Sequence, residues 1–132
     1  QNVKSINVAS FPPPKGAYCH GVHVQSGDAE TMFVSGQVAI DDNGSIPAGI
    51  EAQTALVLQK IERVLAEVGL SIENIVKINT YLTSRDDISG FSAVRNSIFG
   101  DFRPAATLVI VQGLANPDYI VEIDAVAVRI SN

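Results

Sequence analysis

The spacing of apolar and polar residues divides the chain into strand-like and helix-like segments. Apolar residues alternate loosely over Val3–Ala9, and β-type runs follow at Val22–Gln25 and Thr31–Ser35, so these three stretches predict strands. The turn-rich residues 26–30 predict that the second and third strands form a hairpin. The three prolines at 12–14 lack backbone N–H donors, so we expect a loop there.

Two segments carry the three-and-four spacing of an amphipathic helix. The first is Ile50–Val68, and Gly69 follows it at the position of a helix C-cap. The second begins after Asp86 or Asp87, either of which can cap a helix, and continues to about Phe99. The sequence therefore predicts two helices, each with one apolar face.

Three more strands are predicted at Ile75–Thr83, Ala105–Val111 and Ile120–Ile130, where β-branched and apolar residues dominate. The resulting order, β-β-β-α-β-α-β-β, indicates an α+β fold in which two helices cover one face of a mixed sheet. No repeat, linker or low-complexity tract interrupts the pattern, so we expect a single domain over residues 1–132.

The last two strands contain apolar runs, Leu108–Val111 and Val126–Val128, that place apolar side chains on both faces of the sheet. A strand that is apolar on both faces is usually buried on both. The composition agrees, because 46% of residues are hydrophobic and only 17% are charged, which suits a protein that buries surface by association. We therefore expect the uncovered sheet face to contact another subunit.

Charge and residue counts exclude several kinds of protein. The net charge is −5 and the basic residues form no stripe, which argues against nucleic-acid binding. No apolar run approaches the ~20 residues that span a membrane, and no leader sequence is visible. The lone Cys19 fits a reducing compartment, so we expect a cytoplasmic protein. No phosphate-binding or dinucleotide glycine motif is present, and we expect no cofactor.

Cys19, His20 and His23 are residue types that bind zinc, but a zinc site needs three or four ligands. On a strand, Cys19 and His23 would share a face and His20 would oppose them, and the sequence has no other His or Cys. We therefore expect no metal site. The same scarcity argues against a Cys–His nucleophilic pair and favours a small buried thiol.

Glu122 and Asp124 lie two residues apart on a predicted strand, so both point to one face with their Cα atoms ~7 Å apart. Such a pair can divide general acid and general base catalysis, although a solvated strand end gives the same spacing. The apolar neighbours strengthen the catalytic interpretation, because a carboxylate among them needs a partner or a raised pKa. Gly36 follows a strand-like run, where a glycine permits either close approach of a ligand or a β-bulge.

Several short motifs, in order over nearly the whole chain, resemble those of a known family. They are Gly16–Gly21, Phe33–Val38, Gly69–Leu70 with Asn74–Lys77, Arg103–Thr107 and Val121–Val128. The family is the reactive intermediate deaminase superfamily, also called Rid or YjgF. The resemblance implies a chorismate-mutase-like fold and a trimer whose sheets form a central barrel with clefts between subunits. It also implies hydrolysis of reactive enamines or imines, such as 2-aminoacrylate, to 2-keto acids and ammonia.

The resemblance implies roles for individual residues. Glu122 matches the family's acidic residue that binds water, and Tyr18 matches its pocket tyrosine. Gly36 falls where a backbone group lines the cleft. Thr107 and Leu108 fall where strand backbone contacts the ligand.

One position departs from the family pattern. Ala106 stands where deaminating members carry an arginine that grips the substrate carboxylate with both arms of its guanidinium group. Arg103 does not replace it, because it lies three residues away, on the opposite strand face and across Pro104. Arg95 stands where the family often has an asparagine near the ligand. It is either an ordinary exposed helix residue or a relocated anion clamp.

These residues together predict a homotrimer, from a subgroup lacking the strand arginine, that hydrolyses a small imine or enamine between subunits. Glu122 would orient water and shuttle protons, Tyr18 would close the cleft, and Arg95 would hold a carboxylate. The alternative is a non-catalytic trimer that binds a small metabolite or acts as a regulator. Ribonuclease activity, sometimes attributed to this family, is disfavoured by the acidic balance and by the lack of a suitably spaced His pair.

Overall fold

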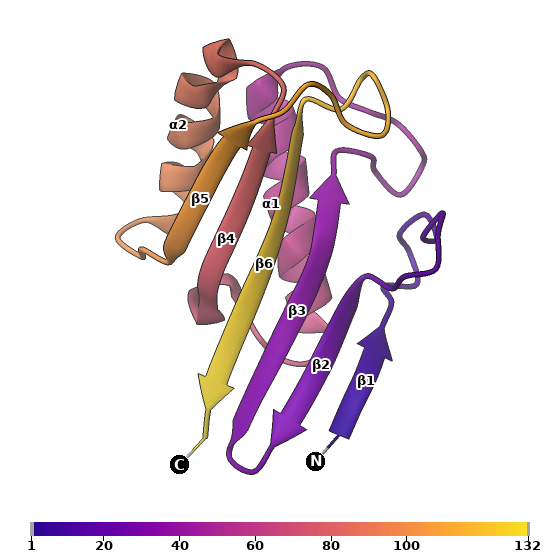
Figure 1. Ribbon diagram of the computed structural model, residues 1–132, viewed down its shortest axis with the longest axis vertical. Coiled ribbons are helices and arrows are strands. Elements are labelled where there is room, and N and C mark those ends of the chain that lie inside the picture. The colour runs from indigo at the N-terminus through magenta and orange to yellow at the C-terminus, as the bar shows by residue number, and fades with distance from the viewer. Residues whose placement is uncertain (1, 132) are drawn as a thin grey trace.

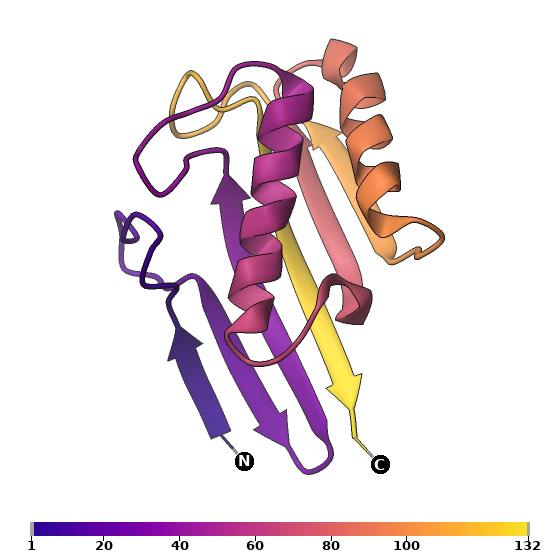
Figure 2. The same cartoon turned by 180° about the vertical axis from the view of Figure 1, so that it is seen from behind.

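The computed structural model describes residues 2–131 as a six-stranded sheet with two helices packed on one face (Figures 1 and 2). In chain order the elements are β1 (Asn2–Ile6), β2 (Gly21–Ser26), β3 (Ala29–Val38), α1 (Ile50–Ala66), η1 (Ile72–Asn74), β4 (Ile75–Leu82), η2 (Arg85–Asp87), α2 (Ile88–Phe99), β5 (Ala105–Ile110) and β6 (Val121–Ile130). The two η elements are short 3-10 helices. This order confirms the predicted α+β fold and its β-β-β-α-β-α-β-β arrangement.

The strands lie in the order β1-β2-β3-β6-β4-β5. Neighbours are antiparallel except β4 and β5, which are parallel because the α2 crossover returns the chain to the same end of the sheet. The sheet is therefore mixed, as predicted. The C-terminal strand β6 lies at its centre, between β3 and β4, whereas β5 forms one edge (Figure 1).

The core fills the space between the sheet and the helices. The apolar stripe of α1 supplies Val57, Ile61 and Leu65, which are fully buried together with Met32 of β3 and Ile123 of β6. Leu70 N donates to Leu65 O across the turn that follows α1. That turn contains Gly69 with φ 77°, the positive φ that favours a glycine after a helix.

Two local predictions were only partly right. Asp87 occupies the N-cap position of α2, as one of the two predicted alternatives, but its side chain makes no capping bond; the Ser84 hydroxyl instead accepts a hydrogen bond from Asp86 N and begins η2. The first strand ends at Ile6 rather than Ala9. Val8 N donates to the Nδ1 of His20, so this stretch turns away from the sheet to hold the loop before β2.

The sheet face opposite the helices is uncovered in the single chain. Phe33 remains 48% exposed on this face, and Val126 beside it is half-buried. In the single chain β5 is an edge strand and Val109 and Ile110 are exposed, so burial of the Leu108–Val111 run on both sides would require a partner and stays a prediction. Among residues 2–131, no helix is long and apolar enough to cross a membrane.

Candidate functional site

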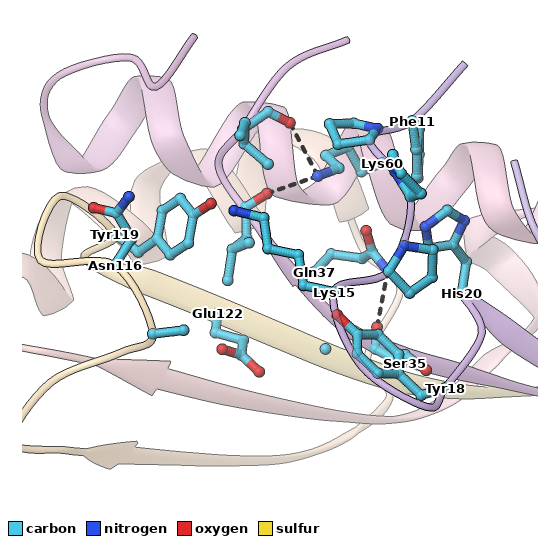
Figure 3. Close-up of a pocket in the computed structure, with 17 residues that line it drawn as sticks. Phe11, Lys15, Tyr18, His20, Ser35, Gln37, Lys60, Asn116, Tyr119 and Glu122 are labelled. Atoms are coloured by element: carbon cyan, nitrogen blue, oxygen red, sulfur yellow. Dashed lines mark hydrogen bonds between the residues drawn. The ribbon is translucent and has the colours of Figure 1, made fainter. Parts of the chain in front are cut away.

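A pocket of about 530 Å³ lies at the end of the sheet where β3 stops and β6 starts (Figure 3). Its walls come from the loop before β2, the end of β3 and the loop between β5 and β6. Three residues that sequence reasoning assigned to the site, Tyr18, Gly36 and Glu122, line this one pocket. The fold brings them together because β6 pairs directly with β3, with Glu122 opposite Val38.

Glu122 is half-buried on the sheet face opposite the helices. Burial raises the pKa of its carboxyl group, and the nearby Asp124 charge raises that pKa further. Within residues 2–131, no side chain or backbone group donates a hydrogen bond to this carboxylate. Its oxygens are therefore free to bind a ligand or water, and the raised pKa suits a group that both accepts and donates a proton.

Gly36 lies directly beside that carboxylate. A Cβ placed on Gly36 would come within 2.2 Å of the Glu122 Oε2 atom. The ladder between β3 and β6 also shifts register between Val34 and Gln37, so Gly36 sits in a bulge. The bulge, one of the alternatives that the sequence left open, therefore occurs at Gly36, and the group that approaches this glycine closely is the Glu122 carboxylate.

Asp124 lies next to Glu122 on the same face but is held by β4. Asn79 Nδ2 donates to its Oδ1 atom at 2.8 Å, and the Tyr81 hydroxyl donates to its Oδ2 atom at 2.8 Å. This hydrogen bond to Asp124 is also the main reason that the pKa of Tyr81 is raised. The two carboxyl groups thus differ in environment, because one has two donors and the other has none among the described residues.

Tyr18 is 58% exposed at the mouth of the pocket, in the loop that precedes β2. Ser35 anchors this loop to β3, because its hydroxyl donates to Cys19 O at 2.6 Å and its backbone N donates to His20 O at 2.9 Å. Hydrogen bonds to β3 therefore fix the loop that contains Tyr18, while the Tyr18 side chain itself stays largely exposed to solvent.

Lys60 was not identified from the sequence as a site residue, yet it lines the same pocket. Its Nζ donates to Val38 O at 2.9 Å and to Ile40 O at 3.0 Å, and burial lowers its pKa to about 8. A signal was present, because Lys60 lies three residues after Val57 and four before Val64, within the apolar stripe of α1.

Arg95 and Ala106 line a different, smaller pocket of about 160 Å³ between α2 and the start of β5. Ala106 pairs with the buried Ile78, so it faces the helix side of the sheet. The Arg95 guanidinium lies 5.4 Å from the centre of the Phe91 ring and donates to Asn96 Oδ1. Ala106 leaves space beneath this cation, but no residue lines both pockets.

The two remaining candidates, Thr107 and Leu108, also lie outside the Glu122 pocket. Thr107 pairs with Asn79 and accepts a hydrogen bond from Lys77 Nζ at 2.8 Å on the uncovered face. Leu108 pairs with the buried Thr80 and packs against the core. One chain therefore unites Tyr18, Gly36 and Glu122 but leaves the other four candidates outside their pocket.

The possible metal ligands are engaged elsewhere. Within residues 2–131, no three His, Cys, Asp or Glu side chains are grouped as a metal site would require. His23 Nε2 donates to Glu30 Oε1 at 2.9 Å, and the half-buried Cys19 Sγ donates to Gly21 O at 3.1 Å. Cys19 and His20 precede β2 rather than lying in it, so the expected alternation of faces does not apply to them.

Comparison with known proteins gives consistent matches over nearly the whole chain. The family model described as Endoribonuclease L-PSP matches residues 9–129. A RutC family protein of Pyrococcus abyssi is 33% identical over 120 residues, which cover 89% of this chain and 91% of that protein. The Escherichia coli protein named "Putative reactive intermediate deaminase TdcF" is 30% identical over 130 residues, which cover 96% of this chain and 97% of its own.

Solved structures show the same likeness. A Thermotoga maritima protein, described as a "putative endoribonuclease", superposes with a TM-score of 0.86 at 34% identity, covering 96% of this chain and 97% of that one. Escherichia coli TdcF with bound serine superposes with a TM-score of 0.84 at 30% identity, covering 96% and 98%. With the family model matching from the loop before β2 to the end of β6, this chain belongs to the Endoribonuclease L-PSP family, within the reactive intermediate deaminase (Rid/YjgF) superfamily.

Proposed function

We propose that this protein hydrolyses a small imine or enamine to a carbonyl compound and ammonia, with Glu122 as the acid–base group. The observation that carries this proposal is the Glu122 carboxyl itself. It is half-buried in a pocket, has a raised pKa, and receives no hydrogen bond from the described residues. A carboxyl group in that state can take a proton from one species and return it to another.

The proposed chemistry needs one water molecule and no cofactor. Glu122 accepts a proton from water as the water oxygen bonds to the C=N carbon, and the C=N π electrons move to nitrogen. The protonated carboxyl returns that proton to the nitrogen, which gives a carbinolamine. Glu122 then passes the proton of the carbinolamine hydroxyl to the amino group, the C–N bond breaks, and ammonia leaves as the C–O bond becomes the carbonyl. An enamine reacts through its imine tautomer. Tyr18, at the mouth of the pocket, is placed to limit access of bulk water to the reacting group.

The complete site is proposed to form between two copies of the chain. In one chain the Glu122 pocket and the Arg95–Ala106 pocket are separate. The uncovered face with its exposed Phe33 offers apolar surface for association into a trimer. Apposition would bring the Arg95 guanidinium of one copy to the Glu122 pocket of another. There it would hold a substrate carboxylate, the role of the arginine that deaminating members of the family carry at the position of Ala106.

The likeness to TdcF supports a substrate of amino-acid size. The TdcF crystal structure contains bound serine, a small molecule with an amino group and a carboxylate. We therefore expect the substrate to be a 2-imino acid or a similarly small anion. The loss of the strand arginine removes a charge-assisted contact, so turnover of ordinary 2-imino acids is expected to be slow unless Arg95 compensates.

The test is hydrolysis of enzymatically generated 2-aminoacrylate by the wild type, Glu122→Gln and Ala106→Arg. We expect Glu122→Gln to lower turnover by about 100-fold or more, the usual contribution of a positioned acid–base group. Wild-type turnover independent of Glu122 would contradict the mechanism. Turnover that appears only in Ala106→Arg would favour the alternative, a metabolite-binding or regulatory protein that has kept the pocket but lost the catalytic activity. A monomer by light scattering would refute the intersubunit cleft.

A further inference from the structure

Lys60 is a buried amine that the proposed hydrolysis does not use. Its side chain is held in the apolar stripe of α1, between Val57 and Val64, and the residue is only 5% exposed. Its amino end nevertheless reaches the wall of the pocket that Tyr18 and Glu122 also line (Figure 3). Most lysines are solvated at the protein surface, and a buried amine at the wall of a ligand-sized cavity is instead typical of a reactive or ligand-binding group.

The hydrogen bonds of Lys60 can all be made by a neutral amine. A neutral amine has two N–H donors and one lone pair, whereas an ammonium has three donors. Nζ donates to Val38 O at 2.9 Å and to Ile40 O at 3.0 Å, which uses both donors of the neutral form. No further acceptor for Nζ, and no carboxylate within salt-bridge distance, occurs among residues 2–131. The fourth tetrahedral position of the nitrogen has no partner among these residues, and it can carry the lone pair of a neutral amine.

The surroundings act on the charge in both directions. The Phe11 ring, whose centre lies 5.0 Å from Nζ, favours a cation, whereas the Arg63 guanidinium, 4.6 Å from the centre of the same ring, brings a second positive charge close by. Burial is the largest effect, and together with the Arg63 charge it holds the pKa of Lys60 at about 8 against the opposing charges of Asp42 and Asp41. At pH 7 roughly a tenth of such amines are neutral, against fewer than about one in a thousand for a lysine with an ordinary pKa of ~10.4.

We propose that Lys60 is a carbonyl-reactive amine that forms a reversible Schiff base with small aldehydes or 2-keto acids entering this pocket. The Nζ lone pair forms a bond to the carbonyl carbon, the C=O π electrons move to oxygen, and one Nζ proton passes to that oxygen. The resulting carbinolamine loses its hydroxyl group and a proton from Nζ as one water molecule, which leaves a C=N bond to Lys60. No oxidant, reductant or cofactor is required, and hydrolysis reverses the reaction.

This inference goes beyond the proposed hydrolysis and does not depend on it. The reactive group lies on α1, whereas Glu122 lies on β6, and the carbonyl compound that reacts is supplied from solution. If the proposed hydrolysis does occur, its carbonyl product belongs to the class of compound that Lys60 would capture. Lys60 would then hold the product in the pocket until water releases it.

Reductive trapping tests the proposal directly. The full chain is incubated briefly with glyoxylate and cyanoborohydride, and peptide mapping by mass spectrometry locates the carboxymethylated amines. We expect adduct at Lys60 to exceed adduct at the exposed Lys4 by about tenfold or more at pH 7.5, and to saturate with glyoxylate concentration. The initial rate at Lys60 should rise as pH increases through about 8 and then level off.

Matched variants separate the possible outcomes. Lys4→Gln should leave the Lys60 adduct unchanged, and Lys60→Arg, which keeps a cation but lacks a reactive amine, should abolish it. Mapping of the wild type identifies the labelled lysine even if Lys60→Arg fails to fold. Adduct spread evenly over the exposed lysines and the chain's α-amino group, without saturation, would overturn the proposal. Glu122→Gln should still be labelled at Lys60, so loss of 2-aminoacrylate turnover and loss of labelling are independent results.

Discussion

The Glu122 carboxylate occupies the space beside Gly36 that a side chain at position 36 would fill. A Cβ on Gly36 would lie 2.2 Å from Oε2 and 3.0 Å from Cδ of Glu122. The carboxylate is the free end of a flexible side chain, so an added methyl group would displace it rather than the two strands. Position 36 therefore controls the orientation of Glu122 without contributing any reactive atom.

We expect Gly36→Ala to separate activity from stability. Displacement of the carboxylate should lower the rate of imine hydrolysis by about 100-fold, the usual worth of a positioned acid–base group. The free energy of unfolding should change by less than about 1 kcal/mol, because the strand gains a residue with less backbone freedom to lose. Steady-state kinetics and urea denaturation measure the two effects.

Gly113→Ala is the matched control for this substitution. A Cβ at Gly113 meets no atom within 4 Å, so both activity and stability should stay close to those of the wild type. Full activity in Gly36→Ala would show that the carboxylate position seen here is not the one used in the reaction.

The pH dependence of the reaction should change when the charge of Asp124 is removed. Burial and then the Asp124 charge raise the pKa of Glu122, so Asp124→Asn should lower that pKa toward its usual value. The limb of the kcat/KM profile that belongs to Glu122 should then move to lower pH. Tyr81→Phe removes a hydrogen-bond donor but keeps the Asp124 charge, so the limb should move less or not at all. Equal profiles for the wild type and Asp124→Asn would show that another group titrates.

Lys60 should make stability depend on pH in the alkaline range. Its pKa is about 8 in the folded protein and ~10.4 in an unfolded chain, so the unfolded state binds more protons between these values. Stability relative to Lys60→Met should therefore rise as pH increases from about 8 to about 10.5. Urea titrations of both proteins at several pH values measure this difference, and a flat difference would show that Lys60 keeps an ordinary pKa.

A second ionic cluster should act in the acid range. Glu30 is buried and accepts hydrogen bonds from His23 Nε2 at 2.9 Å and from Arg129 Nη2 at 2.9 Å. The hydrogen bond from His23, followed by Arg129, holds the pKa of Glu30 below its usual value against the opposing effect of burial. The charge on Glu30 stabilises the folded protein at pH values above the usual carboxyl pKa of an unfolded chain. This contribution is lost as the pH falls through the lowered pKa of Glu30 in the folded protein.

Glu30→Gln tests this cluster. It should lower the free energy of unfolding by about 1–2 kcal/mol at pH 7, because the charged acceptor for the Arg129 guanidinium and the His23 ring is lost. The difference from the wild type should shrink as pH falls below about 4. Denaturant titrations at pH 7 and pH 3.5 make the comparison, and an unchanged difference at both would argue against ionisation of Glu30 as its cause.

Much of the fold follows from local pattern. The two helices and the later strands were found at nearly their observed positions, because apolar spacing reports which face of an element is buried. Where the prediction failed, a contact from a distant residue decided the outcome. Val8 leaves the strand because its N–H is taken by His20, twelve residues later in the chain. Single-sequence patterns contain no information about such partners.

For the site, the sequence by itself determined which chemical groups are present: a carboxylate at Glu122, a glycine at position 36 and no arginine at position 106. Only the tertiary structure decided which of them meet. Pairing of β3 with β6 places Gly36 against Glu122, while β5 at the far edge carries Ala106 to a separate pocket with Arg95. It also brought Lys60 to the Glu122 pocket. The physical reason is that strand pairing and helix packing join residues by burial of apolar surface, which local sequence spacing does not record.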